Sequence, residues 1–595
     1  MARSKRAVLF TPKGGGGIVK KSKIALKPYL DTIAEHCSTL SNQELRDILL
    51  CLARDVPTSG RVNFLEKIES YLPGRRPAAI PDTDAVEQIL YGIEALRESI
   101  QERISSIEDG SYWDDLDVWG DDGYYEEEPD SISEDQDEEL GAFFDDAERL
   151  FLDERLEDAR KVYEALFNLI HDIKKEAYFS PPDEIDIREA RARYCRCVFE
   201  TANRDKRLDD FTGAMEIDVS NPYNENEYDE DYPLMQDVID AKPGELEDLK
   251  SFLPAWKKAL TKRGTKGRPA GLLLEAVHRL EGINGVSRLA KKWENDQPQG
   301  YLFWLDILKK ENDQKRIISV SKEGLKALKE GKPRERVARF MIDAAEELND
   351  AHHILLGKRE RFFSCMSDQN LLDLVDEATD QDKRDNELDT VIRFFEARKE
   401  IDQGNELYAK TLLMSGNLNS AFVLVKDEKS IGWSSGINAG VVFAAVLSVL
   451  ADHSEKASMI KTLLRDYANK RAMYSEMFSL DDCKGTSFYD EIIKGLKQNK
   501  EIKSQAEEYF SWAEKIGKSR IDHIVSNKHR RAYERAAQVL GSLAEVLLVL
   551  GQKSKAAKIL HAYYSEKYNR FSAFRKEVKA VVKGSDLLRN SDFLN

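Results

Sequence analysis

The sequence predicts an all-α protein: a degenerate solenoid of helix hairpins with a small N-terminal helical unit and an acidic disordered linker. Residues 151–159, 412–421 and 549–556 carry the same hairpin corner, in which an apolar helix end meets a Gly or acidic turn. An Ala five residues after the turn position opens each return helix, where two helices approach closely. The steps between the corners do not share one period. Solenoids present extended surfaces, which favours partner binding over catalysis.

The composition excludes a membrane protein. Of the 595 residues, 41% are hydrophobic and 33% are charged, with a mean hydropathy of -0.54. The longest apolar run, 439–451, is too short to cross a bilayer, and the apolar stretch after the basic start is too short for a signal peptide. Six scattered cysteines are typical of reduced thiols. We therefore expect a cytoplasmic protein with no membrane contact.

The net charge of -18 is unevenly distributed along the chain. Residues 1–30 hold eight Lys/Arg and no acid, whereas residues 108–139 hold sixteen Asp/Glu and no base. Residues 501–595 hold eighteen bases and eleven acids. One chain therefore carries fields of opposite sign, and each field favours partners of the other sign.

The N-terminal segments divide by composition. Residues 1–28 form a Gly-rich basic arm, which we expect to be flexible. Residues 29–107 are predicted to be a helical unit. In this unit Ser41 and Glu44 have the spacing of a capping box, and a further helix is expected over 62–72. An apolar stripe from Val86 to Ile107 predicts a long amphipathic helix.

Acids and aromatic residues without helical spacing predict a flexible linker over 108–139. Helical repeats follow over 140–390, with an acidic interruption at 209–233, and C-terminal helical repeats over 391–583 precede a tail, 584–595. Turn-like breaks are predicted at 264–269, 296–298, 331–333 and 429–436.

Six patterns resemble the helical region that accompanies SWIM zinc fingers in bacterial proteins, at residues 338–350, 359–364, 432–436, 520–524, 530–537 and 571–575. The resemblance covers about 140–583 and implies a tetratricopeptide-like helical array in a bacterial protein. A SWIM finger needs Cys-x-Cys followed by Cys-x-His. Cys195 and Cys197 supply only the first half, because Cys365 and Cys483 lack the following His. No metal and no cofactor is expected.

The acidic linker is the first candidate site. Its carboxylates and rings could mimic a phosphate chain for a basic partner, or dock on the basic C-terminal region of the chain itself. The alternative is a solvated spacer. The candidate residues are Trp113, Asp114, Asp115, Trp119, Tyr124 and Tyr125.

A basic cluster near the C-terminus is the second candidate site. Lys528, Arg531 and Arg535 are predicted to share a helix face, with Arg520 and Arg530 nearby. The cluster could bind phosphate, an acidic peptide or the linker. Alternatively, its arginines pair with carboxylates between adjacent repeats. A basic turn at 264–269, with a Gly-Arg-Pro that resembles a minor-groove hook, is a weaker candidate for nucleic-acid contact.

These features predict a non-enzymatic helical-repeat scaffold or adaptor that binds or sequesters a protein partner, such as a basic regulator of the sigma-factor type. One alternative is a protease-cleaved effector or regulator in a CRISPR-linked bacterial antiviral defence system, which rests on architecture alone. Another is a nucleic-acid-binding module, which the charge of -18 disfavours. An enzyme would need a convergent set of ionisable groups, which the spacing does not reveal.

Overall fold

The computed structural model is helical throughout the residues that it describes, and no strand occurs among them. These residues are 24–55, 64, 65, 68, 83–109, 111–114, 130–176, 185–217, 232–264, 267–398, 405–428, 431, 439–469, 487–498 and 505–589. The chain divides into two compact units, residues 1–289 and 290–595. The all-α prediction is confirmed. None of the helices in the described part combines the length and apolar character needed to span a bilayer.

The first unit contains the long helix that the apolar stripe predicts and the capping box that Ser41 predicts. The Ser41 N–H donates to Glu44 Oε2 at 2.8 Å, and the Glu44 N–H donates to Ser41 Oγ at 3.3 Å. The helices are α1 (Leu26–Thr39), α2 (Asn42–Asp55), α4 (Thr83–Asp109), α5 (Ser111–Asp114), α6 (Glu134–Leu152), α7 (Leu156–Glu176), α8 (Ile187–Thr201), α9 (Arg207–Glu216), α10 (Met235–Asp240), α11 (Leu249–Arg263) and α12 (Gly267–Trp293), which runs across the unit boundary.

Helices extend into segments that the sequence assigned to the arm, the linker and the acidic interruption. α1 begins inside the predicted arm, α5 lies inside the predicted linker, and α9 begins just before the predicted interruption and extends into it. α6 begins within the acidic run because Ser133 and Gln136 form a capping box, and the acids of its first turn favour the positive end of the helix dipole. Of the predicted helix over 62–72, the structure describes residues 64, 65 and 68 only.

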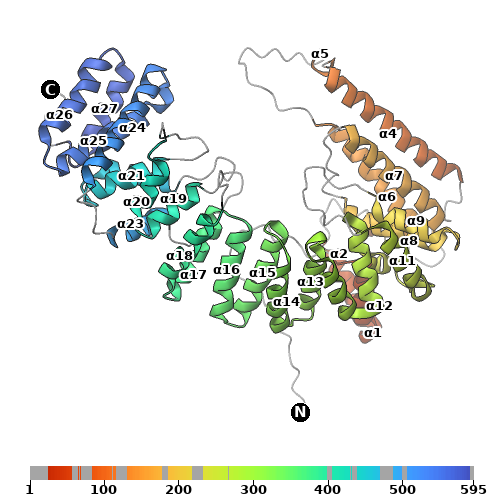
Figure 1. Ribbon diagram of the computed structural model, residues 1–595. Coiled ribbons are helices and arrows are strands. Elements are labelled where there is room, and N and C mark those ends of the chain that lie inside the picture. The colour runs from red at the N-terminus through yellow and green to blue at the C-terminus, as the bar shows by residue number, and fades with distance from the viewer. Residues whose placement is uncertain are drawn as a thin grey trace. The chain divides into compact units, whose positions relative to one another are not determined.

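The second unit is a succession of antiparallel helices, several of which Figure 1 shows side by side. They are η2 (Glu294–Asp296), α13 (Gln299–Lys310), α14 (Gln314–Ala327), α15 (Lys332–Glu347), α16 (Ala351–Ser364), α17 (Asp368–Asp380), α18 (Arg384–Glu396), α19 (Asn405–Met414), α20 (Leu418–Val425), α21 (Ala439–Leu450), α22 (Ser458–Ala468), α23 (Phe488–Gln498), α24 (Ala506–Ser526), η5 (Arg530–Ala532), α25 (Tyr533–Val549), α26 (Lys553–His561), the π-helical η6 (Ala562–Lys567) and α27 (Ser572–Gly584).

The three predicted hairpin corners share one backbone geometry. Glu154, Gly416 and Gly551 have φ of 61°, 80° and 73°, in the left-handed region. Each donates its N–H to the carbonyl three residues back, and the next residue donates to the carbonyl five residues before itself, which is a Schellman turn. The Ala residues five positions later, Ala159, Ala421 and Ala556, are 0% exposed. The predicted corners are therefore confirmed.

The same turn also occurs at corners that the sequence pattern did not identify. Their left-handed residues are Asn312, Asn349, Asp382, Asp452 and Lys528. From Asn312 to Asp452, with Gly416 in its place between them, the corners recur in steps of 37, 33, 34 and 36 residues. This spacing is close to the 34-residue period of tetratricopeptide repeats. The period was hidden because the left-handed residue changes from Gly to Asn or Asp, both of which tolerate positive φ.

Ion pairs connect neighbouring helices of the second unit. Arg361 of α16 pairs with Glu335 of α15 at 3.2 Å, and Lys358 of α16 pairs with Glu377 of α17 at 2.8 Å. The buried Arg384 of α18 pairs with Glu491 of α23 at 2.5 Å. Because a buried guanidinium is costly unless it is paired, these bases serve the packing of the helices.

Candidate functional site

The basic cluster lies on a turn and not on one helix face. α24 ends at Ser526, Lys528 has a φ of 58°, Arg530 and Arg531 belong to η5, and α25 begins at Tyr533. The prediction that Lys528, Arg531 and Arg535 share a helix face was wrong, because Lys528 lies in the Schellman turn that follows α24, before the helix that contains Arg535 begins. We call residues 528–531 the basic turn.

The bases of the basic turn differ in exposure and pairing from Lys358, Arg361 and Arg384, which pair with carboxylates of neighbouring helices. Lys528, Arg530 and Arg531 are all exposed, and no carboxylate in the described part of the chain forms an ion pair with any of them. These three bases therefore do not pair with carboxylates of adjacent repeats in the described part of the chain, as the alternative prediction required. A charge that packing does not use is available to a partner.

Arg520 lies on α24 before the basic turn, and Arg535 lies on α25 after it. Both are close to Tyr467 of α22. Partial burial raises the pKa of the neighbouring Asp466, and Arg535 opposes this shift. Arg520 is half-buried, and burial lowers the pKa of its guanidinium, with Arg535 acting in the same direction. Arg520 therefore belongs to the contact of α22 and α24, whereas Arg535 is exposed on the first turn of α25 and lies near the same tyrosine.

A second turn adjoins the basic turn. The Tyr568 hydroxyl lies 3.0 Å from Ser526 Oγ and donates to Asp522 Oδ1 at 3.0 Å, while Lys567 Nζ pairs with Asp522 Oδ2 at 2.7 Å. These bonds join the end of η6 to the end of α24. Arg570, which is exposed, follows two residues after Tyr568. Sequence reasoning missed Arg570, because no local pattern connects it with residues forty positions earlier.

Most of the acidic linker falls outside the described residues. Asp115, Trp119, Tyr124 and Tyr125 lie there, and of Trp113 and Asp114 only the backbone is described, in α5. The partner-binding role of these six residues stays a prediction.

Cys195 and Cys197 are packing residues of α8. Both thiols are buried, and burial raises the pKa of Cys195 to about 12 and raises that of Cys197 as well. Positions two apart on a helix point in different directions, so the pair does not converge on one ion. Within the described ranges, no three His, Cys, Asp or Glu side chains are grouped so that they could hold a metal.

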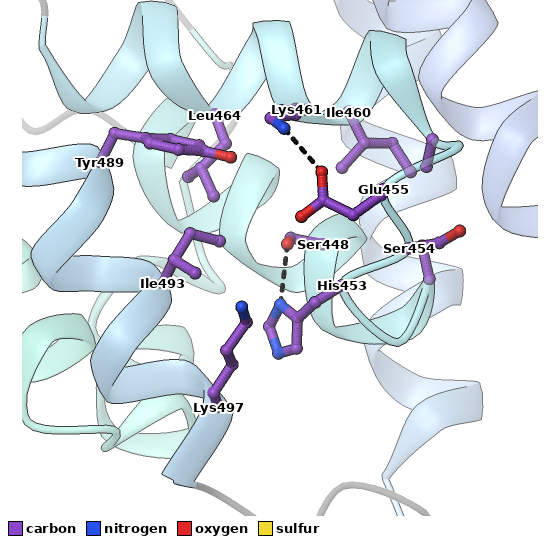
Figure 2. A pocket seen from close by; sticks show the side chains of 12 residues that line it. Ser448, His453, Ser454, Glu455, Ile460, Lys461, Leu464, Tyr489, Ile493 and Lys497 are labelled. Carbon is purple, nitrogen blue, oxygen red and sulfur yellow. Dashed lines mark hydrogen bonds and ion pairs between the residues drawn. The ribbon is translucent and has the colours of Figure 1, made fainter. Parts of the chain in front are cut away.

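A small cavity lies between the turn that joins α21 to α22 and the facing side of α23 (Figure 2). Its volume is about 30 Å³. Ser448 Oγ lies 3.1 Å from Nδ1 of His453, whose pKa is lowered by burial and by Lys497, and Lys461 pairs with Glu455 at 2.7 Å. This space suits one or two water molecules, whereas ligand pockets measure roughly 300–1,000 Å³.

No protein-family model matches this chain, and a search of curated proteins finds no significant similarity.

Proposed function

We propose that this protein is a non-enzymatic helical scaffold that binds a protein partner. One observation carries the proposal: Lys528, Arg530 and Arg531 are exposed on one short turn without a carboxylate pair in the described structure. By contrast, Lys358, Arg361 and Arg384, which lie between neighbouring helices, are paired. Uncompensated charge at one place on a packed body favours recognition of an oppositely charged surface.

The hydrogen bonds that hold the basic turn in place also favour the proposal. The N–H groups of Lys528 and His529 donate to Val525 and Ile524 carbonyls at 3.1 Å each. The Tyr568 hydroxyl bonds on the α24 side of the turn. A backbone held in this way loses little conformational freedom on binding, so more of the interaction energy appears as affinity.

The sequestering of a basic regulator by the acidic segment 108–139 is a second part of the proposal, and its support is composition. Sixteen acids without a base would attract a basic surface at long range. The cleaved-effector alternative stays a prediction from architecture.

The scaffold proposal is tested with the tagged full-length chain purified from its native host at physiological salt. We expect a companion protein in stoichiometric amount, which sedimentation measures as a complex heavier than the 67.9 kDa chain. The variant K528E/R530E/R531E should lose the companion. The matched control K553E/K555E/K558E, which reverses three exposed lysines of α26, should keep it. A clean monomer in every preparation would contradict the proposal.

A further inference from the structure

We infer that the two adjoining turns form one surface, made of Lys528, Arg530, Arg531 and Arg570, that binds an acidic segment of a protein partner. The inference rests on the proposed function and adds the chemistry of the partner. We call these four residues the acceptor surface. Tyr568 and Asp522 join its two turns, as described above.

The side chains of this surface suit carboxylates. Arg530, Arg531 and Arg570 are exposed guanidinium groups, each of which offers a planar fork of N–H donors. A carboxylate accepts two parallel hydrogen bonds from such a fork, and an arginine surface therefore recognises Asp and Glu with defined geometry. Asp522 is already held by Lys567 and Tyr568. The acceptor arginines have no ion pair with it.

Nucleic acid fits this surface less well. The nearby rings of Tyr533 and Tyr568 are only 3% and 5% exposed, so they offer no platform on which bases could stack. Four bases are also few for a duplex, since non-specific binding neutralises a longer run of phosphates. The net charge of -18 on the chain repels a polyanion at long range, whereas a short acidic segment carries less charge.

Lys528 supplies an independent observation. It occupies the left-handed position of its Schellman turn with a φ of 58°, where glycine is the residue without strain. At the next corner the same position is Gly551. The left-handed backbone at Lys528 therefore costs strain that glycine avoids, although no carboxylate among the described residues pairs with its side chain.

The test measures fluorescence anisotropy of a labelled peptide of sixteen residues that alternates Glu and Ser, titrated with the full-length chain. A Gln/Ser peptide of the same length and a single-stranded DNA of equal charge are the comparison probes. We expect the Glu/Ser peptide to bind, with an affinity that falls as salt rises. The variant K528E/R530E/R531E should weaken binding by roughly tenfold or more, and K553E/K555E/K558E by less than about twofold.

Two further variants test the roles of single residues. R570K keeps the charge and removes the fork, so binding of the Glu/Ser peptide should weaken, and an unchanged affinity would exclude a bidentate contact at Arg570. K528G should raise the Tm, because glycine adopts the left-handed backbone without strain, and it should weaken peptide binding. If Lys528 had only a structural role, the substitution would not weaken binding.

Three outcomes would overturn the inference: equal weakening by both triple variants, DNA binding through the same four residues that is tighter than peptide binding, or no binding of the Glu/Ser peptide. If the native companion is captured by the wild type and by K528E/R530E/R531E alike, the acceptor surface fails while the scaffold proposal stands.

Discussion

Gly495 shows how closely two backbones approach in this fold. A Cβ at this position would lie 2.1 Å from the Met414 carbonyl oxygen and 2.6 Å from that of Leu413. The neighbouring Gly416 would place its own Cβ 2.8 Å from the Gly495 carbonyl oxygen. Backbone atoms cannot move aside as a side chain can, so α19 and α23 pack as they do only because residue 495 has no side chain.

Gly495→Ala should therefore lower the free energy of unfolding by about 3 kcal/mol. The matched control is Gly141→Ala in α6, where a Cβ meets nothing within 4 Å. That variant should raise stability by roughly 0.5–1 kcal/mol, because Ala loses less backbone entropy than Gly in a helix. Urea denaturation of both variants measures the difference. Equal effects of the two would contradict the packing argument.

The cysteines give a second prediction at the residue scale. Because the Cys195 and Cys197 thiols are buried and their pKa is raised, they should resist alkylation in the native protein at pH 8. Cys37, Cys51 and Cys365 are exposed and should react. Peptide mapping by mass spectrometry, before and after denaturation, distinguishes the two groups. Rapid native labelling of α8 would show that the helix is not packed as described.

At the scale of elements, buried carboxylates hold helix ends in place. Glu545 of α25 accepts the N–H groups of Met459 and Ile460 at the start of α22, each at 3.1 Å, and the Ser585 hydroxyl after α27 at 2.6 Å. One carboxylate thus joins three helices. Its acceptor oxygens satisfy N–H groups that have no partner within α22.

Burial raises the pKa of Glu545 above 4.5, although the hydrogen bonds from Ser585, Met459 and Ile460 oppose the shift. The native state therefore takes up this proton at a higher pH than the unfolded chain does. The stability from this proton is present below pH 4.5 and is lost as pH rises through the raised pKa. As pH falls from 7 towards 4.5, the free energy of unfolding of the wild type should therefore increase relative to that of Glu545→Gln, which has no proton to take up at this position. A difference that is independent of pH would refute the burial argument.

At the scale of the whole molecule, the chain consists of two compact units in which most packing is between helices close in sequence. In a solenoid each repeat contacts only its neighbours, so a destabilised repeat affects the adjacent repeats and few others. Glu545 lies in the second unit, and the buried Glu275, which accepts the Met235 N–H at 2.7 Å, lies in the first.

Glu545→Ala should accordingly speed amide hydrogen exchange in α21, α22 and α25, and leave α7 and α8 unchanged. Glu275→Ala should have the reverse effect, with faster exchange in α8 and α10. Hydrogen exchange read by mass spectrometry on the full-length chain gives both results. Faster exchange throughout both units after either substitution would show one cooperative body.

Only part of the acceptor surface could be predicted from the sequence. Lys528, Arg530 and Arg531 were found from the sequence because they are close together in it. Arg520 and Arg535 were grouped with them, and the structure places these two arginines on α24 and α25, on either side of the turn, with both near Tyr467. Arg570 depends on a contact between residues 526 and 568, and no local pattern encodes such a contact.

The sequence by itself determined the helical class and the corners at Glu154, Gly416 and Gly551, because helical periodicity and turn chemistry are local properties. Only the tertiary structure decided which bases are paired and which are exposed, and that the corners from Asn312 to Asp452 recur at a nearly constant spacing. The physical reason is that pairing and burial depend on residues distant in the chain, whereas a left-handed Asn or Asp looks like any other polar residue until its backbone is seen.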